Sequence, residues 1–228
     1  MPIPSTTTAV ASGRLLLADV VYDRLLGVIV SGELAPGEVV REEEIGEWLG
    51  VSRTPVRDAM RRLGEQGLLD YQPNRGSHVS ALHASDLGHI VEVVAALYGM
   101  AGRLAVAQLG DDDFAEIDVH VARILEAYRG GDRVHRAAEV SLALRVISSH
   151  SGNPVLERAL ALLSPHLVRL QTLAPMYPTE DEIVERFTAL DAALRTRDPE
   201  LVGQTMQAYV LHFGRALLGE AVKSGVAS

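Results

Sequence analysis

The sequence predicts a mainly α-helical protein, in which three helices and a β-hairpin precede a bundle of six helices. Three observations lead to this expectation. Hydrophobic residues recur at helical spacing through most of the 228-residue chain. Short strand patterns occur at residues 68–82, on either side of a Pro-Asn-Arg-Gly turn. From Asp86 onward, helix-capping residues follow one another and strand signals vanish.

Composition and charge narrow the class of protein. A hydrophobic content of 47% is enough to bury a core, and the absence of cysteine excludes disulfides and thiolate metal sites. The sequence shows neither a secretion signal nor an uninterrupted apolar run of about 18 residues, so we expect a cytoplasmic protein with no membrane partner. Residues 1–80 carry 8 basic and 11 acidic side chains, and residues 81–228 carry 13 and 19. Because neither half is basic, any contact with nucleic acid must be local.

The amino-terminal region is expected to contain an arm, three helices and a hairpin. Residues 1–17 are rich in Pro, Ser and Thr, which suits a flexible arm, and the domain itself is expected over residues 18–80. The helices are predicted at Ala18–Ser31, Glu42–Leu49 and Arg53–Gln66, and the strands at Leu68–Gln72 and Ser77–Leu82. Gly50 ends the second helix, and a tight turn joins the two strands.

The third predicted helix concentrates positive charge on one face. Arg53, Arg57 and Arg61 follow one another at intervals of four residues, so they line one side of the helix while apolar residues line the other. Ser52 is a suitable N-cap, and Pro55 is tolerated in the first turn because its missing N–H has no intrahelical partner there. An arginine-rich face is often only a solvated surface, so its meaning depends on the neighbouring elements.

Those neighbouring elements indicate a winged helix-turn-helix, in which the hairpin forms the wing. In this motif the start of the second helix of the pair reaches base edges in the major groove. Arginine suits that role because its guanidinium can bind O6 and N7 of guanine together, which discriminates by about 1–3 kcal/mol. The candidate DNA-binding residues are Ser52, Arg53, Thr54, Arg57 and Arg61 on the helix and Asn74, Arg75 and Gly76 at the hairpin tip.

The same region carries a family resemblance. The segments "GVSRTPVR" and "NRGSHVS" are its strongest parts, and it extends without gaps over nearly all of residues 18–80. This region closely resembles the DNA-binding domain of the GntR transcription regulators. The resemblance implies that Ser52, Arg53, Thr54 and Arg57 contact the operator. It also implies that the hairpin tip forms a wing.

The rest of the chain, residues 86–228, is expected to be an all-α domain that follows a linker at residues 81–85. Its helices are predicted at 86–108, 111–129, 132–150, 154–174, 180–197 and 199–223. Their expected N-caps are Ser85, Asp132, Asn153, Thr179 and Asp198, with Glu182 completing a capping box. The segments "SSHSGNPVLERAL" and "ALRTRDPELVGQTMQ" resemble motifs of the FCD effector domain, which belongs to the FadR-type branch of the family. Six helices suggest its shorter, VanR-like subtype.

The FCD resemblance also implies a site inside the bundle, where many relatives hold a metal with one Asp and three His side chains. In this chain those positions are Val140, Leu144, Phe187 and Tyr209, and the Arg and Glu that often bind an effector carboxylate are Val94 and Tyr98. We therefore expect no metal or other cofactor. An apolar or aromatic effector with one or two hydrogen-bonding groups fits better, because burying an unpaired charge costs several kcal/mol.

Alternatives stay open for this site. His212 lies one turn from Tyr209 and is the best further candidate for a polar group in the pocket. One alternative is that side chains fill the space and leave no cavity. Another is a displaced metal site built from His150, His166 and His212.

Together these features predict a dimeric, ligand-responsive transcription regulator. We expect a repressor that leaves an inverted-repeat operator when a small-molecule effector binds its helical domain. Its expected partners are double-stranded operator DNA, the effector and a second copy of the chain. The alternative is an effector-independent DNA-binding protein whose helical domain only dimerises. An enzyme is not expected, since the sequence lacks nucleophile-elbow, zinc-protease, P-loop and dinucleotide-binding patterns.

Overall fold

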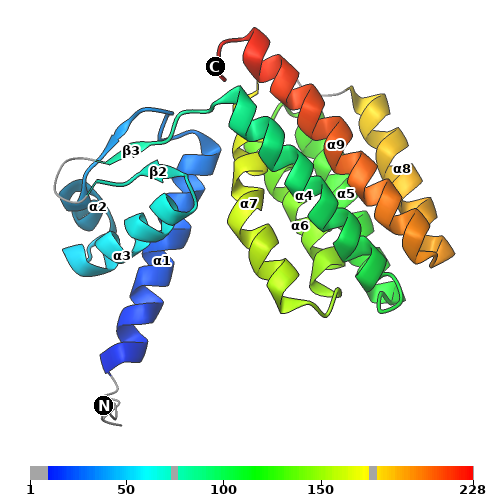
Figure 1. Cartoon of the computed structure of the whole chain (residues 1–228), viewed down its shortest axis with the longest axis horizontal. Helices are drawn as coiled ribbons and strands as arrows, with labels where there is room; N and C mark the ends of the chain where they lie inside the picture. Colours follow the sequence, from blue (N-terminus) through cyan, green and yellow to red (C-terminus); the bar gives the residue numbers. More distant parts are fainter. Residues whose placement is uncertain (1–9, 73–76, 175–178, 228) are drawn as a thin grey trace. The chain divides into compact units, whose positions relative to one another are not determined.

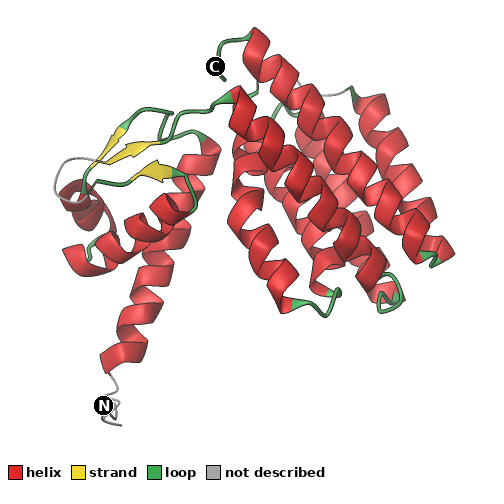
Figure 2. Ribbon diagram, viewed as in Figure 1, coloured by secondary structure: helices red, strands yellow, loops and turns green. Residues whose placement is uncertain are grey.

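The computed structural model describes residues 10–72, 77–174 and 179–227, with side chains described from Leu17 onward. The chain divides into two compact units, with the boundary between Ala81 and Leu82. Figure 1 follows the elements along the sequence, and Figure 2 shows that the described strands all belong to the first unit. The second unit is helical throughout its described elements. The predicted mainly α fold class is therefore confirmed.

The first unit has the order of elements of a winged helix-turn-helix. Its elements are α1 (Val10–Ser31), β1 (Val39–Val40), α2 (Glu42–Leu49), α3 (Arg53–Glu65), β2 (Leu69–Asp70) and β3 (Ser77–Val79). Strand β3 lies in the centre of the sheet and pairs antiparallel with both β1 and β2. The predicted arm at residues 1–17 needs correction, because α1 already begins at Val10. Strand β1 was not predicted, because two residues are too few to show an alternating pattern.

The core of the first unit fixes which face of α3 is exposed. Val56, Met60 and Leu63 of α3 are fully buried and belong to the same hydrophobic cluster as Leu25 and Ile29 of α1. Full burial of a side chain of this size contributes about 1.5–3 kcal/mol. The rotation of α3 about its own axis is therefore set by its apolar stripe, and the opposite face is directed to solvent.

The turn between α2 and α3 depends on two glycines. Gly50 adopts a left-handed conformation, with φ of 66°, and its N–H bonds to Glu47. Gly46 is buried, and a Cβ atom there would lie 3.0 Å from the carbonyl oxygen of Val51. The close turn therefore allows the two helices to pack as a helix-turn-helix.

The described residues of the second unit form six helices at nearly the predicted positions. They are α4 (Ala84–Ala105), α5 (Asp111–Arg129), α6 (Arg133–Ser149), α7 (Pro154–Leu173), α8 (Glu180–Thr196) and α9 (Pro199–Lys223). The predicted N-caps Asp132, Asn153, Thr179 and Asp198 all accept backbone hydrogen bonds. The prediction of Ser85 as an N-cap and as the last residue of the linker was wrong, because His83 is the N-cap and α4 begins at Ala84.

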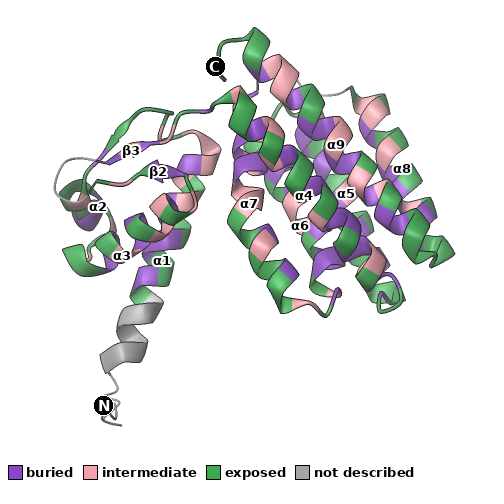
Figure 3. Ribbon diagram, in the orientation of Figure 1, coloured by how far each residue is buried: buried purple, intermediate pink, exposed green. Residues whose placement is uncertain are grey.

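Helices α4 and α9 form the closest helix pair of the bundle and lie side by side in Figure 1. A Cβ atom on Gly99 would lie 2.9 Å from the Gly203 carbonyl oxygen, and one on Gly102 would lie 2.3 Å from the Met206 sulfur. Figure 3 shows buried positions distributed along the helices of this unit. By length and composition α4 is apolar enough to cross a membrane. Much of it, however, is buried in the core, so its apolar character suits a core helix.

Candidate DNA-binding surface and effector cavity

The exposed face of α3 carries the predicted arginines. The side chains of Arg53, Arg57 and Arg61 are 66%, 49% and 56% exposed, and Ser52 and Thr54 beside them are also exposed. Ser52 occupies the N-cap position with extended backbone, but its hydroxyl makes no capping hydrogen bond within the part of the chain that the structure describes. The N-cap position predicted for Ser52 is therefore confirmed, whereas the capping hydrogen bond predicted for its hydroxyl is wrong.

Each of the three arginines has an acidic partner in the protein itself. Arg53 Nη2 lies 2.7 Å from Glu43 Oε1, and Arg61 Nη1 lies 2.5 Å from Glu65 Oε1. Both of these pairs are exposed, and exposed ion pairs contribute at most about 1 kcal/mol. A DNA phosphate or base edge can therefore replace Glu43 or Glu65 at little cost.

The third pair, between Arg57 and Glu42, is less exposed. Arg57 Nη2 lies 3.0 Å from Glu42 Oε2, and only 15% of the Glu42 side chain is exposed. The hydrogen bond and the charge of Glu42 raise the pKa of Arg57. Tyr71 also donates to Glu42, and burial, followed by the charge of Glu42, raises the pKa of Tyr71. Neither Glu42 nor Tyr71 was predicted as a site residue, since they lie 15 and 14 residues from Arg57 in sequence.

The predicted wing tip, Asn74, Arg75 and Gly76, lies outside the described residues. The strands on either side of it are described, and the N–H of Gln72 donates to the Ser77 hydroxyl at 3.2 Å. The wing contacts predicted from the sequence stay a prediction.

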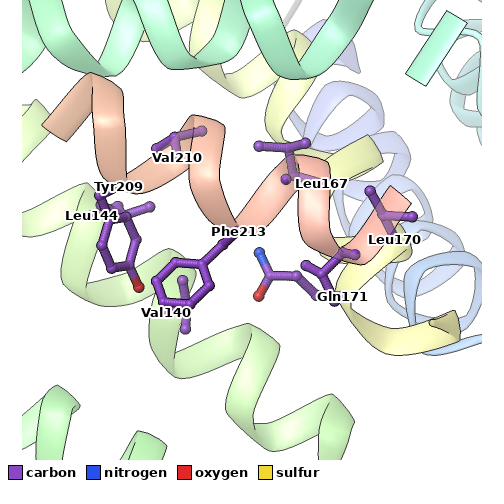
Figure 4. A pocket seen from close by; sticks show the side chains of 10 residues that line it. Val140, Leu144, Leu167, Leu170, Gln171, Tyr209, Val210 and Phe213 are labelled. Atoms are coloured by element: carbon purple, nitrogen blue, oxygen red, sulfur yellow. The ribbon is translucent and has the colours of Figure 1, made fainter. Parts of the chain in front are cut away.

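In the helical unit, three of the predicted effector residues line one cavity between α6, α7 and α9. Val140 and Leu144 come from α6 and Tyr209 from α9. The other lining residues are Leu167, Leu170, Gln171, Val210, Phe213, Gly214 and Leu217. Figure 4 shows Tyr209, Phe213 and Gln171 around this hollow. Its volume is about 30 Å³, which is room for no more than a few water molecules.

The other predicted effector residues lie elsewhere, so the expectation of one shared cavity needs correction. Val94 and Tyr98 of α4 are buried but do not line this hollow. The Tyr98 hydroxyl lies 3.3 Å from the Ser164 hydroxyl on α7, and burial raises the pKa of Tyr98. The Tyr98 side chain is thus held by α7. His212 is half-buried, with its ring 5.2 Å from that of Phe213 and its Nε2 4.0 Å from Glu182.

Phe187 lines a different and larger hollow, between α5 and α8. This groove has a volume of about 200 Å³ and is lined by Ile117, Asp118, Val121, Leu125, Val184, Phe187, Thr188 and Asp191. The Phe187 and Tyr209 rings lie 5.2 Å apart, and the Tyr209 and Phe213 rings 4.7 Å apart. One aromatic row therefore reaches from the groove to the small cavity, with Phe187 at one end and Phe213 at the other.

The histidines considered for a displaced metal site lie in separate surroundings. His150 Nδ1 bonds to the carbonyl oxygen of Val146, and its Nε2 lies 3.3 Å from Asp113. His166 is buried on α7, and His212 faces Glu182. Among residues 10–72, 77–174 and 179–227, no group of three or more His, Asp or Glu side chains is placed to hold a metal ion.

A winged helix-turn-helix with an arginine face on its second helix, followed by a six-helix domain with an apolar interior, defines a two-domain DNA-binding regulator. Comparison with known proteins gives the family. The model of the bacterial regulatory proteins of the gntR family matches residues 17–79, and that of the FCD domain matches residues 89–212. The chain belongs to the GntR family of bacterial transcription regulators, in the branch that carries an FCD domain.

Individual relatives support this assignment. The chain is 33% identical over 197 residues to the "Probable D-xylose utilization operon transcriptional repressor" of Paenarthrobacter nicotinovorans. The aligned region covers 86% of this chain and 87% of the relative. It is 30% identical over 175 residues to the "HTH-type transcriptional regulator McbR" of Escherichia coli, covering 74% and 78%. The solved structure of E. coli McbR/YncC matches with a TM-score of 0.80 and 26% identity, over 90% of this chain and 98% of that one.

Proposed function

We propose that this protein is a homodimeric repressor that reads an inverted-repeat DNA operator with α3 and is released by an apolar small molecule. The arginine face of α3 carries this proposal. Arg53 and Arg57 lie in the first two turns, where a helix-turn-helix approaches base edges, and their long side chains are exposed. Ser52 and Thr54 beside them are exposed, and their hydroxyls would donate to phosphates. Binding to chromosomal DNA would place the protein in the cytoplasm.

Operator selection tests this proposal. The full-length protein is incubated with random-sequence duplexes, the bound fraction is amplified over several rounds, and the enriched DNA is sequenced. A two-fold dimer should enrich two inverted half-sites at a fixed spacing. Footprinting on the enriched duplex should then show protection of both halves. Enrichment of no sequence, or of a single half-site bound by one chain, would contradict the proposal.

The surface of α4 supports the dimer. Val93, Leu97, Met100 and Leu104 follow one another at intervals of four, three and four residues, which places them on one face of the helix. Three of them are large exposed hydrophobic side chains, 49%, 43% and 41% exposed in chain order, whereas Leu97 is half-buried. In an antiparallel pair of α4 helices related by a two-fold axis, Val93 would face Leu104 and Leu97 would face Met100. Such a stripe is self-complementary, as a two-fold interface requires.

The dimer surface is tested by placing a charge in the stripe. Met100→Glu should shift the protein from dimer to monomer in analytical ultracentrifugation, because two carboxylates would be buried close together in the interface. Val155→Glu is the control, since Val155 is an exposed hydrophobic residue at the start of another helix, α7. A Met100→Glu protein that stays dimeric at micromolar concentration would exclude this surface.

For the effector, we propose an apolar or aromatic molecule that enters between Tyr209, Val140 and Leu144. All three side chains line the cavity, and none of them carries a charge. An anion held here without a charged partner would pay several kcal/mol for desolvation. Since ligand pockets are commonly about 300–1,000 Å³, the aromatic row would have to move for the effector to enter.

The small size of the cavity also favours the second candidate function, a DNA-binding protein whose helical unit only dimerises. A thermal-shift screen separates the two. Apolar metabolites and small carboxylates are tested against the protein, and hits are tested for operator release. An effector at 100 times its Kd should add about 2.7 kcal/mol of stability. Response only to citrate- or lactate-like acids would contradict the apolar effector. Response to none of the compounds, with operator binding intact, would favour the dimerisation module.

A further inference from the structure

We propose that Glu42 is a positioning residue for Arg57. The Glu42 carboxylate holds the Arg57 guanidinium in the orientation that reads a base. It also cancels the attraction of Arg57 for phosphates in DNA of other sequences. The inference rests on the proposed function of α3 as the DNA-reading helix. It assigns to an acidic residue of α2 a part in sequence discrimination.

The geometry of the pair is that of a fixed guanidinium. Glu42 lies in the first turn of α2, and Arg57 lies one turn into α3. Arg57 donates through Nε to both carboxylate oxygens at 3.3 Å, and through Nη2 to Oε2 at 3.0 Å. A side-on contact through two nitrogens restrains rotation of the guanidinium, whereas a contact through a single nitrogen leaves it free to rotate. The neighbouring pair, Arg53 with Glu43, has both side chains about two-thirds exposed and lacks this enclosure.

Tyr71 holds the carboxylate from the other side. Its hydroxyl donates to Glu42 Oε1 at 3.3 Å. Tyr71 directly follows β2, and its own Cβ packs so close to Gly64 of α3 that a Cβ atom added there would lie 2.8 Å away. The network thus joins α2, α3 and the chain next to the wing. Because three elements fix it, the position of the Arg57 side chain is set before DNA arrives.

The atoms that Glu42 engages determine what remains for DNA. A guanidinium has five N–H groups in one plane. Nε and one N–H of Nη2 point to Glu42, so the two N–H groups of Nη1 and the second N–H of Nη2 lie on the edge not engaged by Glu42. That outer edge is the one that can bind O6 and N7 of guanine together. Arg57 therefore keeps the hydrogen bonds that read a base.

Glu42 also neutralises the positive charge of Arg57. The Arg57 guanidinium and the Glu42 carboxylate together carry no net charge, so the pair contributes little to the release of counterions that drives binding to any DNA. A base edge is recognised by hydrogen bonds, whereas a phosphate in non-specific DNA is recognised mainly by charge. Glu42 thus lowers non-specific binding more than specific binding, and the ratio of the two affinities rises.

The test compares Glu42→Gln with Glu44→Gln in the full-length protein, on a selected operator duplex and on a scrambled duplex. Both variants remove one negative charge from the first turn of α2, but Glu44 pairs with Arg41 at 2.6 Å. Glu42→Gln should bind scrambled DNA more tightly, and its plot of log K against log salt concentration should steepen by about 0.9. Its ratio of specific to non-specific affinity should fall about tenfold or more. Glu44→Gln should change that ratio by less than about twofold.

Two further variants separate positioning from charge and from folding. Tyr71→Phe leaves every charge in place but releases Glu42, so the affinity ratio should fall while the salt dependence stays as in the unmodified protein. Adding Glu42→Gln to Arg57→Ala should leave the affinity ratio of Arg57→Ala unchanged. Equal behaviour of Glu42→Gln and Glu44→Gln, or additive effects of Glu42→Gln and Arg57→Ala, would overturn this inference. If the unmodified protein shows no preference for the selected duplex, the proposed function itself fails instead.

Discussion

Replacement of Gly99 by alanine should destabilise the helical unit, although alanine is the better helix former. A Cβ atom at Gly99 would lie 2.9 Å from the Gly203 carbonyl oxygen and 3.0 Å from Gln207 Cβ, so α4 and α9 would have to separate. Overpacking of this kind costs about 1–3 kcal/mol. The higher helix propensity of alanine returns about 0.8–1.0 kcal/mol. The expected net effect is a loss of about 0–2 kcal/mol.

Gly219→Ala is the matched control on the other end of the same helix pair. Gly219 also lies inside α9, but a Cβ atom there would meet no atom within 4 Å, so only the gain in helix propensity applies. The two variants should therefore differ by about 1–3 kcal/mol, with the Gly219 variant the more stable. Chemical unfolding followed by circular dichroism measures both. Equal stabilisation by the two replacements would refute the close contact between α4 and α9.

Two further predictions concern the same unit. Thr179→Ala should cost about 1 kcal/mol near neutral pH, since it removes a capping bond to α8. Hydrogen bonds from Thr179 lower the pKa of Glu182, so this carboxylate stabilises the fold above its ordinary pKa of 4.5, and its contribution is lost as the pH falls further. Alanine keeps the backbone N–H that bonds to Glu182 and loses only the hydroxyl bond, so the difference in melting temperature between the two proteins should narrow in acid; a constant difference down to pH 3 would argue against the hydrogen bond from the Thr179 hydroxyl to Glu182. Phe213→Ala should cost about 3–5 kcal/mol, because the ring is buried beside the cavity, and indole should recover part of that loss by filling the space. Calorimetry with indole compares Phe213→Ala with the unmodified protein. If indole does not raise the melting temperature of Phe213→Ala, the space left by the ring has collapsed.

The parts of the fold that depend on local sequence were predicted well. Asp132, Asn153 and Thr179 each bond to backbone N–H groups one turn ahead, so their signal is contained within a few residues. The ends of the strands were predicted less well. Strand β1 exists because Val39 and Val40 pair with β3, almost 40 residues later in the chain, and no local pattern records that contact.

The candidate site was predicted only where one helix carries it. The exposure of Arg53 and Arg57 follows from the apolar stripe on the opposite face of α3, which the sequence shows directly. The partner of Arg57 does not follow in this way, because Glu42 reaches it through the fold of the α2–α3 turn. The shape of the cavity was harder still. Whether Tyr98 faces it depends on a contact with Ser164, and small differences in packing decide whether any space remains.

The most direct test of the account is the loss of sequence discrimination when the arginines of α3 are removed. Arg53→Ala and Arg57→Ala are compared with Arg215→Ala, whose side chain is 65% exposed on α9. Affinities for the selected operator and for a scrambled duplex are measured at one fixed salt concentration. Each α3 variant should lose about 1–3 kcal/mol of preference for the operator, and Arg215→Ala should lose none. If neither α3 variant changes the ratio of specific to non-specific affinity, α3 does not read the DNA sequence.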